Sequence, residues 1–185
     1  IISNEALTDV VYKMVLEGDT SAITAPGQFV NIQLSGKFLR RPISVCDYDG
    51  ETLTIVYKVV GKGTEAMSAM APGKELDILT GLGNGYDLSL SGDAPVLLGG
   101  GVGVPPMYNL AKKLVALGKK VSVILGFNTA SEIFFEEEFK KCSGCGKHLL
   151  LSEENFVRKT RSKDGFSNRC KKCDKLDRER KKLGA

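Results

Sequence analysis

Four cysteines in two closely spaced pairs are the residues with the clearest chemistry in this sequence. Two residues separate the members of each pair, and 24 residues separate the pairs, which are Cys142 with Cys145 and Cys170 with Cys173. Two thiolates on a Cys-x-x-Cys turn bind one metal ion, and two such pairs complete a tetrahedral shell. We therefore predict a zinc site, with rubredoxin-type iron as the alternative. Gly146 permits the positive-φ turn common in zinc knuckles.

The surroundings of these cysteines favour zinc over iron, because they are rich in Lys and Arg and poor in aromatic residues. His148 lies close to the first pair, but four thiolates already fill the shell, so we expect it not to bind the metal. The nearby apolar residues are too few for a stable core, so this module should need metal to fold.

A run of glycines offers a second kind of chemistry. The run consists of Gly99, Gly100, Gly101 and Gly103, and it joins an apolar strand-like segment to a helical pattern. Glycines let dinucleotide phosphates approach the backbone, and a helix N-terminus favours negative charge. Pro105 and Pro106 suit the first helical turn. Because position 104 is Val, the segment does not match G-x-G-x-x-G, and a tight turn without a ligand is the alternative.

The elements that must position these residues change character near residue 93. Before it, short β-branched segments separated by Gly, Pro or Asp predict an antiparallel barrel or sandwich. We expect strands at 10–16, 28–34, 41–46, 52–60 and 75–79, and a short helix at 64–70. After it, a strand at 95–98, a helix ending at Leu117, a strand at 120–126 and a helix at 131–141 indicate a parallel β-α-β-α pattern.

Charge marks a second boundary, near Lys141. Residues 140–185 hold 15 Lys and Arg and 6 Asp and Glu, a balance of +9, whereas the other 139 residues hold 11 and 16, a balance of −5. Such a shift is typical of a domain boundary. The predicted α+β multidomain fold has an antiparallel Greek-key β-barrel at 1–92, a partial parallel α/β nucleotide-binding unit at 93–141 and a small zinc-binding module at 142–185.

Composition favours a soluble cytoplasmic protein. Of the 185 residues 42% are hydrophobic, no apolar stretch approaches the roughly 18 residues that span a membrane, and no signal peptide precedes Ile1. The start on Ile rather than Met indicates a coding frame that is incomplete at this end. Cys-x-x-Cys pairs in an intracellular protein favour metal over disulfides. Cys46 is left alone, and we expect it to be a small buried side chain.

Four runs of residues carry a resemblance to a known family. They read PGQFVNIQL at 26–34, LRRPISVCDYDG at 39–50, IVYKVVGKGT at 55–64 and LLGGGVGVPPMYNLAKKL at 97–114. Together they resemble the electron-transfer subunits of bacterial dihydroorotate dehydrogenase B, within the ferredoxin–NADP reductase superfamily. The resemblance covers residues 1–141 and then stops. In the family, electrons pass from dihydroorotate through FMN of a partner subunit and an iron–sulfur centre to FAD, and then to NAD.

The resemblance implies a FAD site built from three motifs. The family uses an Arg-Pro-Ile-Ser strand, a Tyr-Arg-like tripeptide and a Gly-Thr before a short helix. Here these motifs read Arg41-Pro42-Ile43-Ser44, Val56-Tyr57-Lys58 and Gly63-Thr64. By resemblance, Arg41 neutralises phosphate, Ser44 meets the flavin ring edge, and Gly63 and Thr64 present N–H groups to the pyrophosphate. Each motif alone also suits an exposed strand start or an ordinary helix cap. Because Pro42 lacks a ladder donor, its strand should be an edge or bulged there.

The sequence departs from the family after residues 132–139. Family members continue with strands and helices that complete the nicotinamide site, and with cysteines that hold a 2Fe–2S centre. The plant-type C-x4-C-x2-C spacing is absent, so we expect no such cluster. We therefore expect a weak or incomplete NAD site and an activity that truncation can abolish. No catalytic acid or base is assigned, because the flavin does the redox chemistry.

The tail resembles short four-cysteine zinc modules of phage and bacterial proteins, often found beside HNH-type nucleases. It combines CSGCGK with a basic stretch at 158–163 and a basic helical segment at 170–182. Such a surface can neutralise nucleic-acid phosphates, and a solvated charged helix is the alternative. No His–Asn–His set is present, so binding rather than cleavage is expected.

The function expected from these observations is that of a FAD-binding electron-transfer (reductase) subunit. It would pass electrons between a catalytic dihydroorotate dehydrogenase subunit and NAD in pyrimidine biosynthesis, with no membrane involved. The alternative is a zinc-dependent nucleic-acid-binding protein with a vestigial reductase portion. A third possibility is that two reading frames were joined by an assembly or frame error.

Overall fold

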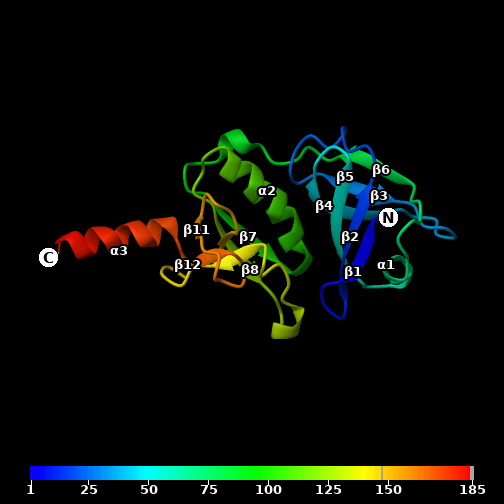
Figure 1. The fold of residues 1–185 in the computed structure, drawn as a ribbon. Coiled ribbons are helices and arrows are strands. Elements are labelled where there is room, and N and C mark those ends of the chain that lie inside the picture. Colours follow the sequence, from blue (N-terminus) through cyan, green and yellow to red (C-terminus); the bar gives the residue numbers. More distant parts are fainter. Residues whose placement is uncertain (147, 184–185) are drawn as a thin grey trace.

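Two sheets and a cysteine-rich module follow one another along the molecule (Figure 1). The computed structural model describes residues 1–146 and 148–183. The first sheet has six antiparallel strands in the order β1-β2-β5-β4-β3-β6. Their bounds are β1 Ser3–Ala6, β2 Val11–Glu17, β3 Phe29–Ile32, β4 Arg41–Tyr48, β5 Thr52–Lys58 and β6 Ile78–Leu82. All five strands expected in this region are therefore present, and β1 is an additional one.

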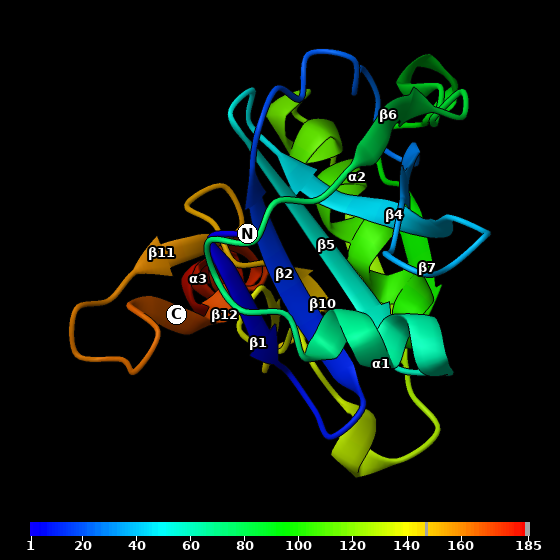
Figure 2. The same cartoon turned by 90° about the vertical axis from the view of Figure 1, so that its right-hand side faces the viewer.

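This sheet has the connectivity of a Greek key. Strands β3, β4 and β5 pair in succession, and β2 pairs with β5 rather than with β3. The described pairings leave β1 and β6 as edges, so closure into a barrel stays a prediction. Met14, Val30, Ile32 and Ile55 are fully buried on one face. The helix α1 (Lys62–Ser68) lies across the end of the sheet where β5 ends (Figure 2), and its Met67 joins this core.

A parallel strand pair and one long helix form the middle of the molecule. Strands β7 (Val96–Gly100) and β8 (Ser122–Gly126) are parallel, as predicted, and α2 (Val104–Ala116) connects them. Three short 3₁₀ turns, η1 (Leu88–Leu90), η2 (Gly101–Gly103) and η3 (Ala130–Glu132), lie in the connections. Because α2 lies between the two sheets, its apolar residues pack against both of them.

Polar contacts add to this packing between α2 and the first sheet. Asn109 donates from Nδ2 to Asp47 Oδ1 at 2.7 Å, and Lys112 Nζ lies 2.5 Å from Asp47 Oδ2. Next to Asp47, Cys46 is 1% exposed and belongs to the core shared with α2, as expected. Burial raises the pKa of the Cys46 thiol, which makes it a packing residue rather than a nucleophile.

The expected helix at 131–141 is wrong. The segment contains the turn η3 and the short strand β9 (Phe139–Lys141), and Phe135 has a φ of 65°, which no α-helix accommodates. The physical reason is aromatic packing. Phe134, Phe135 and Phe139 are all buried in the core with α2, and the helix spacing would not place these three rings on one face.

Part of the tail completes the second sheet. Strand β10 (His148–Leu150) pairs with β9 in a hairpin and also pairs antiparallel with β8, so the order is β7-β8-β10-β9. Phe139 and Leu150 belong to the core around α2. The hairpin covers the β8 edge, whereas Val96, Leu98 and Ile124 remain exposed.

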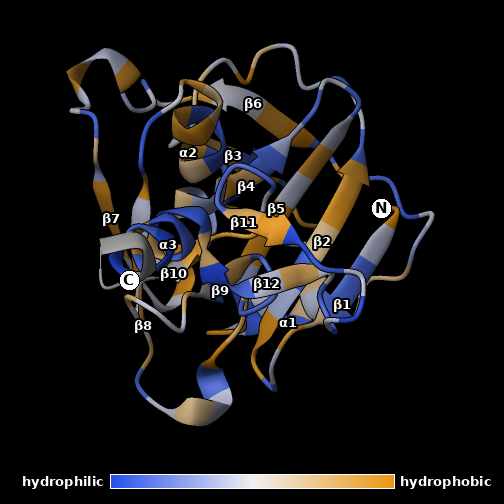
Figure 3. Cartoon of the chain, turned by 60° about the vertical axis from the view of Figure 1, so that its left-hand side comes forward, coloured by the Kyte–Doolittle hydropathy of each residue, from blue (hydrophilic) through white to orange (hydrophobic). Residues whose placement is uncertain are grey.

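The last elements are a small strand pair and a basic helix. Strands β11 (Phe156–Arg158) and β12 (Phe166–Cys170) pair antiparallel, and α3 (Lys171–Leu183) projects from the body (Figure 1). This helix matches the basic helical segment expected at 170–182. Figure 3 shows it to be mostly hydrophilic. Within the described residues, no helix is long and apolar enough to cross a membrane.

Candidate functional site

The side chain of Arg41 lies directly against Gly63. Arg41 begins β4 and Gly63 lies in the first turn of α1, and a Cβ added to Gly63 would lie 2.2 Å from Arg41 Nε. Only a residue without a side chain therefore allows this contact. The neighbouring Arg40 forms a bidentate ion pair with Asp77. Among residues 1–146 and 148–183, Arg41 donates only to backbone carbonyls, at 2.6 Å to Leu39 and 3.4 Å to Arg40.

No acidic side chain pairs with Arg41 among the described residues. An arginine stays charged at all ordinary pH values, and its planar fork matches phosphate oxygens. A guanidinium held at a glycine without an acidic partner is therefore suited to bind an anion. This arrangement fits the phosphate role expected of Arg41 and Gly63 from the sequence.

Thr64 shapes the loop that carries Gly63. It is 8% exposed, and its hydroxyl accepts from the N–H groups of Val60 at 2.9 Å and Gly61 at 3.3 Å and donates to the Gly61 carbonyl at 3.1 Å. The hydroxyl is thus occupied by the protein backbone. Only the backbone N–H of Thr64 remains for the expected ligand contact.

The remainder of the Arg-Pro-Ile-Ser motif alternates along β4. Pro42 and Ser44 are exposed, whereas Ile43 packs against the inner core. The pairing of β4 with β5 begins only at Val45, so one edge of the strand is free at Pro42, in agreement with the requirement of a residue that has no N–H. The Ser44 hydroxyl has no hydrogen-bond partner in the part of the chain that the structure describes.

The side chains of the tripeptide at 56–58 are used within the protein. Val56 packs against α2, and Tyr57 is 1% exposed, with its hydroxyl donating to Asn4 Oδ1 at 2.9 Å. Burial raises the pKa of Tyr57 to about 12. Lys58 forms an ion pair with Glu132 at 3.2 Å. These contacts leave the backbone as the means by which this strand reaches a ligand.

The glycines of the second candidate site have different surroundings. Gly99 is required for packing, because a Cβ there would lie 2.9 Å from Val104 Cα. Gly100, Gly101 and Gly103 have no other atom closer than 3.9 Å to such a position, so their backbone is accessible to a ligand. Strand β5 lies against the turn they form, which places this loop beside the first sheet.

The start of α2 offers few hydrogen-bond donors. Val104 already donates its N–H to the Gly101 carbonyl, and Pro105 and Pro106 have none. The helix N-terminus therefore contributes less to phosphate binding than the sequence pattern suggests. A phosphate at this point would rely on the N–H groups of the glycine loop itself.

The four paired cysteines converge on one point, as their spacing predicts. The sulfur atoms of Cys142, Cys145, Cys170 and Cys173 all lie within 4.8 Å of one another. The first pair occupies the loop of the β9–β10 hairpin, and the second lies where β12 ends and α3 begins. Cys142 is 0% exposed and Cys145 is exposed. Two segments distant in the sequence are thus joined at the cluster.

Two glycines give the first loop its shape. Gly146 has a φ of 72° and donates its N–H to the Cys142 carbonyl at 2.8 Å, which confirms the expected positive-φ turn. Gly144 was not among the predicted site residues, yet a Cβ there would lie 2.9 Å from Cys173 Cβ. A glycine inside the first Cys-x-x-Cys is the sequence signal for such a close approach.

Hydrogen bonds prepare Cys142 for the thiolate form. Its sulfur accepts from the N–H of Cys170 at 3.2 Å and of Gly144 at 3.4 Å. Although burial acts to raise the pKa of Cys142, backbone donors lower it to about 6, whereas burial and the neighbouring thiols raise the pKa of Cys173 to about 12. The expectation for His148 concerns a side chain outside those that the structure describes.

Comparison with known proteins finds similar electron-transfer subunits. The chain is 49% identical over 138 residues to the electron-transfer subunit of dihydroorotate dehydrogenase B (NAD(+)) from Fusobacterium nucleatum, covering 70% of this chain and 53% of that protein. It is 40% identical over 148 residues to the corresponding subunit from Bacillus pumilus, and this match covers 76% of this chain and 57% of that protein. The chain therefore spans little more than half the length of these relatives. It matches no protein-family model.

Solved structures share the fold. An NADH-dependent reduced ferredoxin–NADP oxidoreductase, studied for flavin-based electron bifurcation, matches with a TM-score of 0.66 at 31% identity. The match covers 72% of this chain and 50% of the oxidoreductase chain. Phthalate dioxygenase reductase has a TM-score of 0.62 at 20% identity, with coverages of 75% and 46%. The antiparallel sheet and the strand–helix–strand unit thus have the ferredoxin reductase-like fold.

Proposed function

We propose that residues 1–141 form the FAD-binding part of an electron-transfer (reductase) subunit of dihydroorotate dehydrogenase B, as the similar proteins from Fusobacterium and Bacillus suggest. In this proposal, the subunit passes electrons between a partner catalytic flavoprotein and NAD in pyrimidine biosynthesis, in the cytoplasm. The observation that carries the proposal is the Arg41 guanidinium, which lies on Gly63 without an acidic partner in the described chain.

The residues present fit a FAD. Arg41 would neutralise a phosphate, and the exposed Ser44 hydroxyl would meet the polar edge of the ring. Gly63 would permit close approach of the pyrophosphate, and the Thr64 N–H would donate a hydrogen bond to it. A bound flavin would supply the redox chemistry, and the protein would bind and orient it. Pro42 and Ile43 would support this site by shaping β4, and the strand at 56–58 would contribute backbone groups.

The proposal for NAD is a weak or incomplete site at Gly100, Gly101 and Gly103. The accessible backbone of these glycines supports contact with a phosphate. Two observations weaken the site: the prolines remove donors from α2, and one apolar face of the β7–β8 pair is exposed. We therefore expect FAD to bind and NADH to reduce it slowly or not at all.

For the cysteine cluster we propose zinc. Four sulfur atoms within 4.8 Å of one another suit a tetrahedral ion, and N–H donors to Cys142 stabilise a thiolate. Iron remains the rival metal, and a red protein with stoichiometric iron would favour it. No 2Fe–2S cluster is proposed.

A second function, nucleic-acid binding by the tail, is favoured by one observation. The charge balance of +9 in residues 140–185 includes the exposed basic residues of α3 and of the β11–β12 hairpin. Lys and Arg at such density neutralise phosphates and release counterions.

Titration with FAD tests the main proposal. The purified chain should quench flavin fluorescence and show a flavin absorption band, and Arg41→Glu should abolish both while leaving the circular dichroism unchanged. Arg40→Glu is a poorer control because Arg40 pairs with Asp77, so Lys74→Glu, an exposed lysine without an ion pair in the described chain, serves instead. A colourless protein that takes up no added FAD would refute the proposal.

A further inference from the structure

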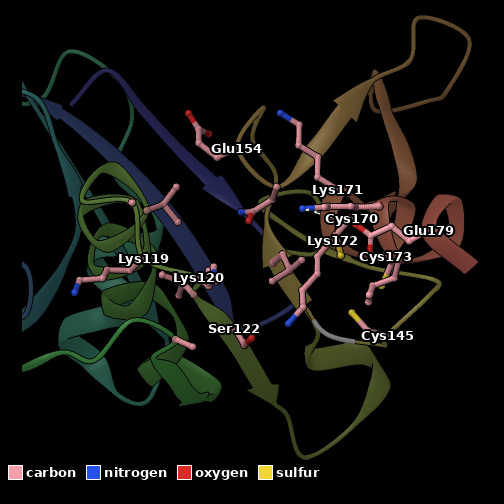
Figure 4. Close-up of a pocket in the computed structure, with 18 residues that line it drawn as sticks. Lys119, Lys120, Ser122, Cys145, Glu154, Cys170, Lys171, Lys172, Cys173 and Glu179 are labelled. Carbon is pink, nitrogen blue, oxygen red and sulfur yellow. Dashed lines mark ion pairs between the residues drawn. The ribbon is translucent and has the colours of Figure 1, made fainter.

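A cavity of about 740 Å³ lies between the α/β unit and the cysteine module (Figure 4). One wall comes from the end of α2, the loop after it and the start of β8. The other wall comes from β10, the end of β12 and the first turns of α3. Neither part of the chain makes this cavity alone, so its chemistry does not follow from either sequence resemblance.

Lysines line both walls. Lys119 and Lys120 stand on the α/β side, and Lys171, Lys172 and Lys175 stand on the α3 side, as Figure 4 shows for the first four. Two of the five are neutralised, because Lys119 pairs with Asp93 at 3.5 Å and Lys175 with Glu179 at 3.9 Å.

Three lysines remain without an ion pair in the described chain. Lys120, Lys171 and Lys172 are exposed, and Glu154 is the other acidic residue of the lining. Lys171 and Lys172 also begin α3, a helix of 13 residues, whose N-terminal dipole adds positive potential. The cavity therefore combines a helix start with three cations, one of which, Lys171, also interacts with Glu154.

A bound metal does not reverse this charge. Four thiolates around one Zn²⁺ carry a net charge of about −2, so the balance of +9 in residues 140–185 would fall to about +7. The module stays strongly cationic as a whole, although Cys145, Cys170 and Cys173 place the negative charge of the cluster in one wall of the cavity. A polyanion would therefore be attracted to the lysines and not to the cysteine wall.

The remainder of the lining is mixed, with Ser122, Asn155, Cys145, Cys170 and Cys173 beside an apolar part. Val115, Val121, Leu149 and Leu176 contribute to it, and no aromatic residue does. Such surface is of no use to a free inorganic anion or to a duplex, which keeps its bases stacked inside. It suits unpaired bases, whose phosphates the lysines would meet. Without an aromatic platform, affinity should be moderate and the sequence preference slight.

We propose that this cavity binds single-stranded nucleic acid, with phosphates at Lys120, Lys171 and Lys172 and a base against the apolar wall. The proposal rests on the nucleic-acid function suggested for the tail, and it goes further by placing a lysine of the reductase portion in the same site.

The test uses the full zinc-loaded chain and a fluorescently labelled oligothymidine of about 12 nucleotides, followed by anisotropy over a salt series. Contact with three phosphates predicts a slope of about −2 for the logarithm of the affinity against the logarithm of salt. Lys120→Glu should weaken binding about tenfold, and Lys171→Glu with Lys172→Glu about hundredfold.

Two matched controls change the same charge outside the cavity. Lys74→Glu controls for Lys120→Glu, and the pair Lys62→Glu with Lys74→Glu, two exposed lysines outside the tail, controls for the Lys171 and Lys172 pair. A further variant, Arg161→Glu with Lys163→Glu in the exposed β11–β12 loop, tests whether the tail binds outside the cavity. Each control should change the affinity less than about threefold. Zinc content and circular dichroism, measured on every variant, test whether metal loading and folding are unchanged.

The outcomes separate the possible failures. No oligonucleotide binding at all would refute the tail function and the site together. Binding that tolerates Lys120→Glu but is lost in the Arg161 and Lys163 variant would refute the cavity and leave the tail function intact. Equal affinity for duplex would refute the single-strand preference. Loss of zinc with unchanged binding per zinc-loaded chain would show that Lys171 and Lys172 serve the metal cluster.

Discussion

Replacing Gly63 with Ala should separate ligand binding from stability. The added methyl group would lie 2.2 Å from Arg41 Nε and 2.9 Å from Cζ, so the guanidinium must move. These atoms are the far end of a flexible side chain, and its backbone partners, the carbonyls of Leu39 and Arg40, lie in an exposed turn. The protein can therefore accommodate the methyl group by giving up the position of one charge.

The magnitude follows from what that charge does. A hydrogen bond from a charged donor contributes about 1.5–3 kcal/mol, so misplacing Arg41 should weaken FAD binding about 10- to 150-fold. Stability should not fall, because Gly63 has a helical conformation and Ala is favoured over Gly there by up to about 1 kcal/mol. The expected variant is at least as stable as the parent and binds FAD poorly.

Fluorescence titration with FAD and thermal unfolding, measured on the same samples, provide the comparison. Gly18→Ala is the matched control, because Gly18 has no positive φ, no neighbouring atom within 4 Å of an added Cβ, and a position near the start of β5 rather than its end. An unchanged FAD affinity in Gly63→Ala would refute the assignment of Arg41. A fall in melting temperature parallel to the affinity would instead assign Gly63 a structural role.

Three further outcomes follow from the structure. Chelation of the metal, or Cys145→Ser, should loosen β8 as well as the tail, because the first cysteine pair closes the β9–β10 hairpin that pairs with β8. Amide hydrogen exchange at residues 122–126 measures this loosening. Protection of these amides that survives metal loss would contradict the prediction. Phe139→Ala should lower the free energy of unfolding by about 3–5 kcal/mol, measured by denaturant unfolding, because Phe139 is 1% exposed in the core around α2. Val157→Ala, a control on the exposed side of β11, should lower it far less. Burial raises the pKa of Tyr57 from 10 to about 12, so the contribution of the neutral Tyr57 hydroxyl to stability is complete below pH 10 and is lost as the pH rises toward 12. Tyr57→Phe should therefore flatten the fall in the free energy of unfolding over that pH interval. An unchanged dependence of the free energy of unfolding on pH would contradict the shift.

Local patterns in the sequence were enough to predict most of the regular elements. β-branched runs located β2 to β5 within about two residues, and the glycine turn followed by two prolines located α2. Strand β6 lies at Ile78–Leu82 rather than 75–79, because the chain pairs with β3 through a register shift. The sequence does not predict strand β1, because Ser3–Ala6 has no β-branched residue and this segment is a strand only through its pairing with β2.

The sites show the same division between local and distant information. The cysteine spacing predicted a cluster because each pair is local, and only two loops had to meet. The contact of Arg41 with Gly63 joins segments that are far apart in sequence, and no pattern reveals that Arg40, not Arg41, pairs with Asp77. The helix expected at 131–141 is wrong because Phe135 and Phe139 pack against Tyr108 of α2, and helix propensity does not register such tertiary contacts.

The hairpin that carries the first cysteine pair also affects how the chain behaves when metal is scarce. With β10 in place, β8 is an interior strand, and the edges of this sheet are β7 and β9. Release of the hairpin would leave both strands of the parallel pair as bare edges, next to the exposed side chains of Val96, Leu98 and Ile124. Unpaired strand edges beside apolar surface are templates for intermolecular pairing. Metal supply would then govern the solubility of the reductase portion, and aggregation would precede any loss of the first sheet.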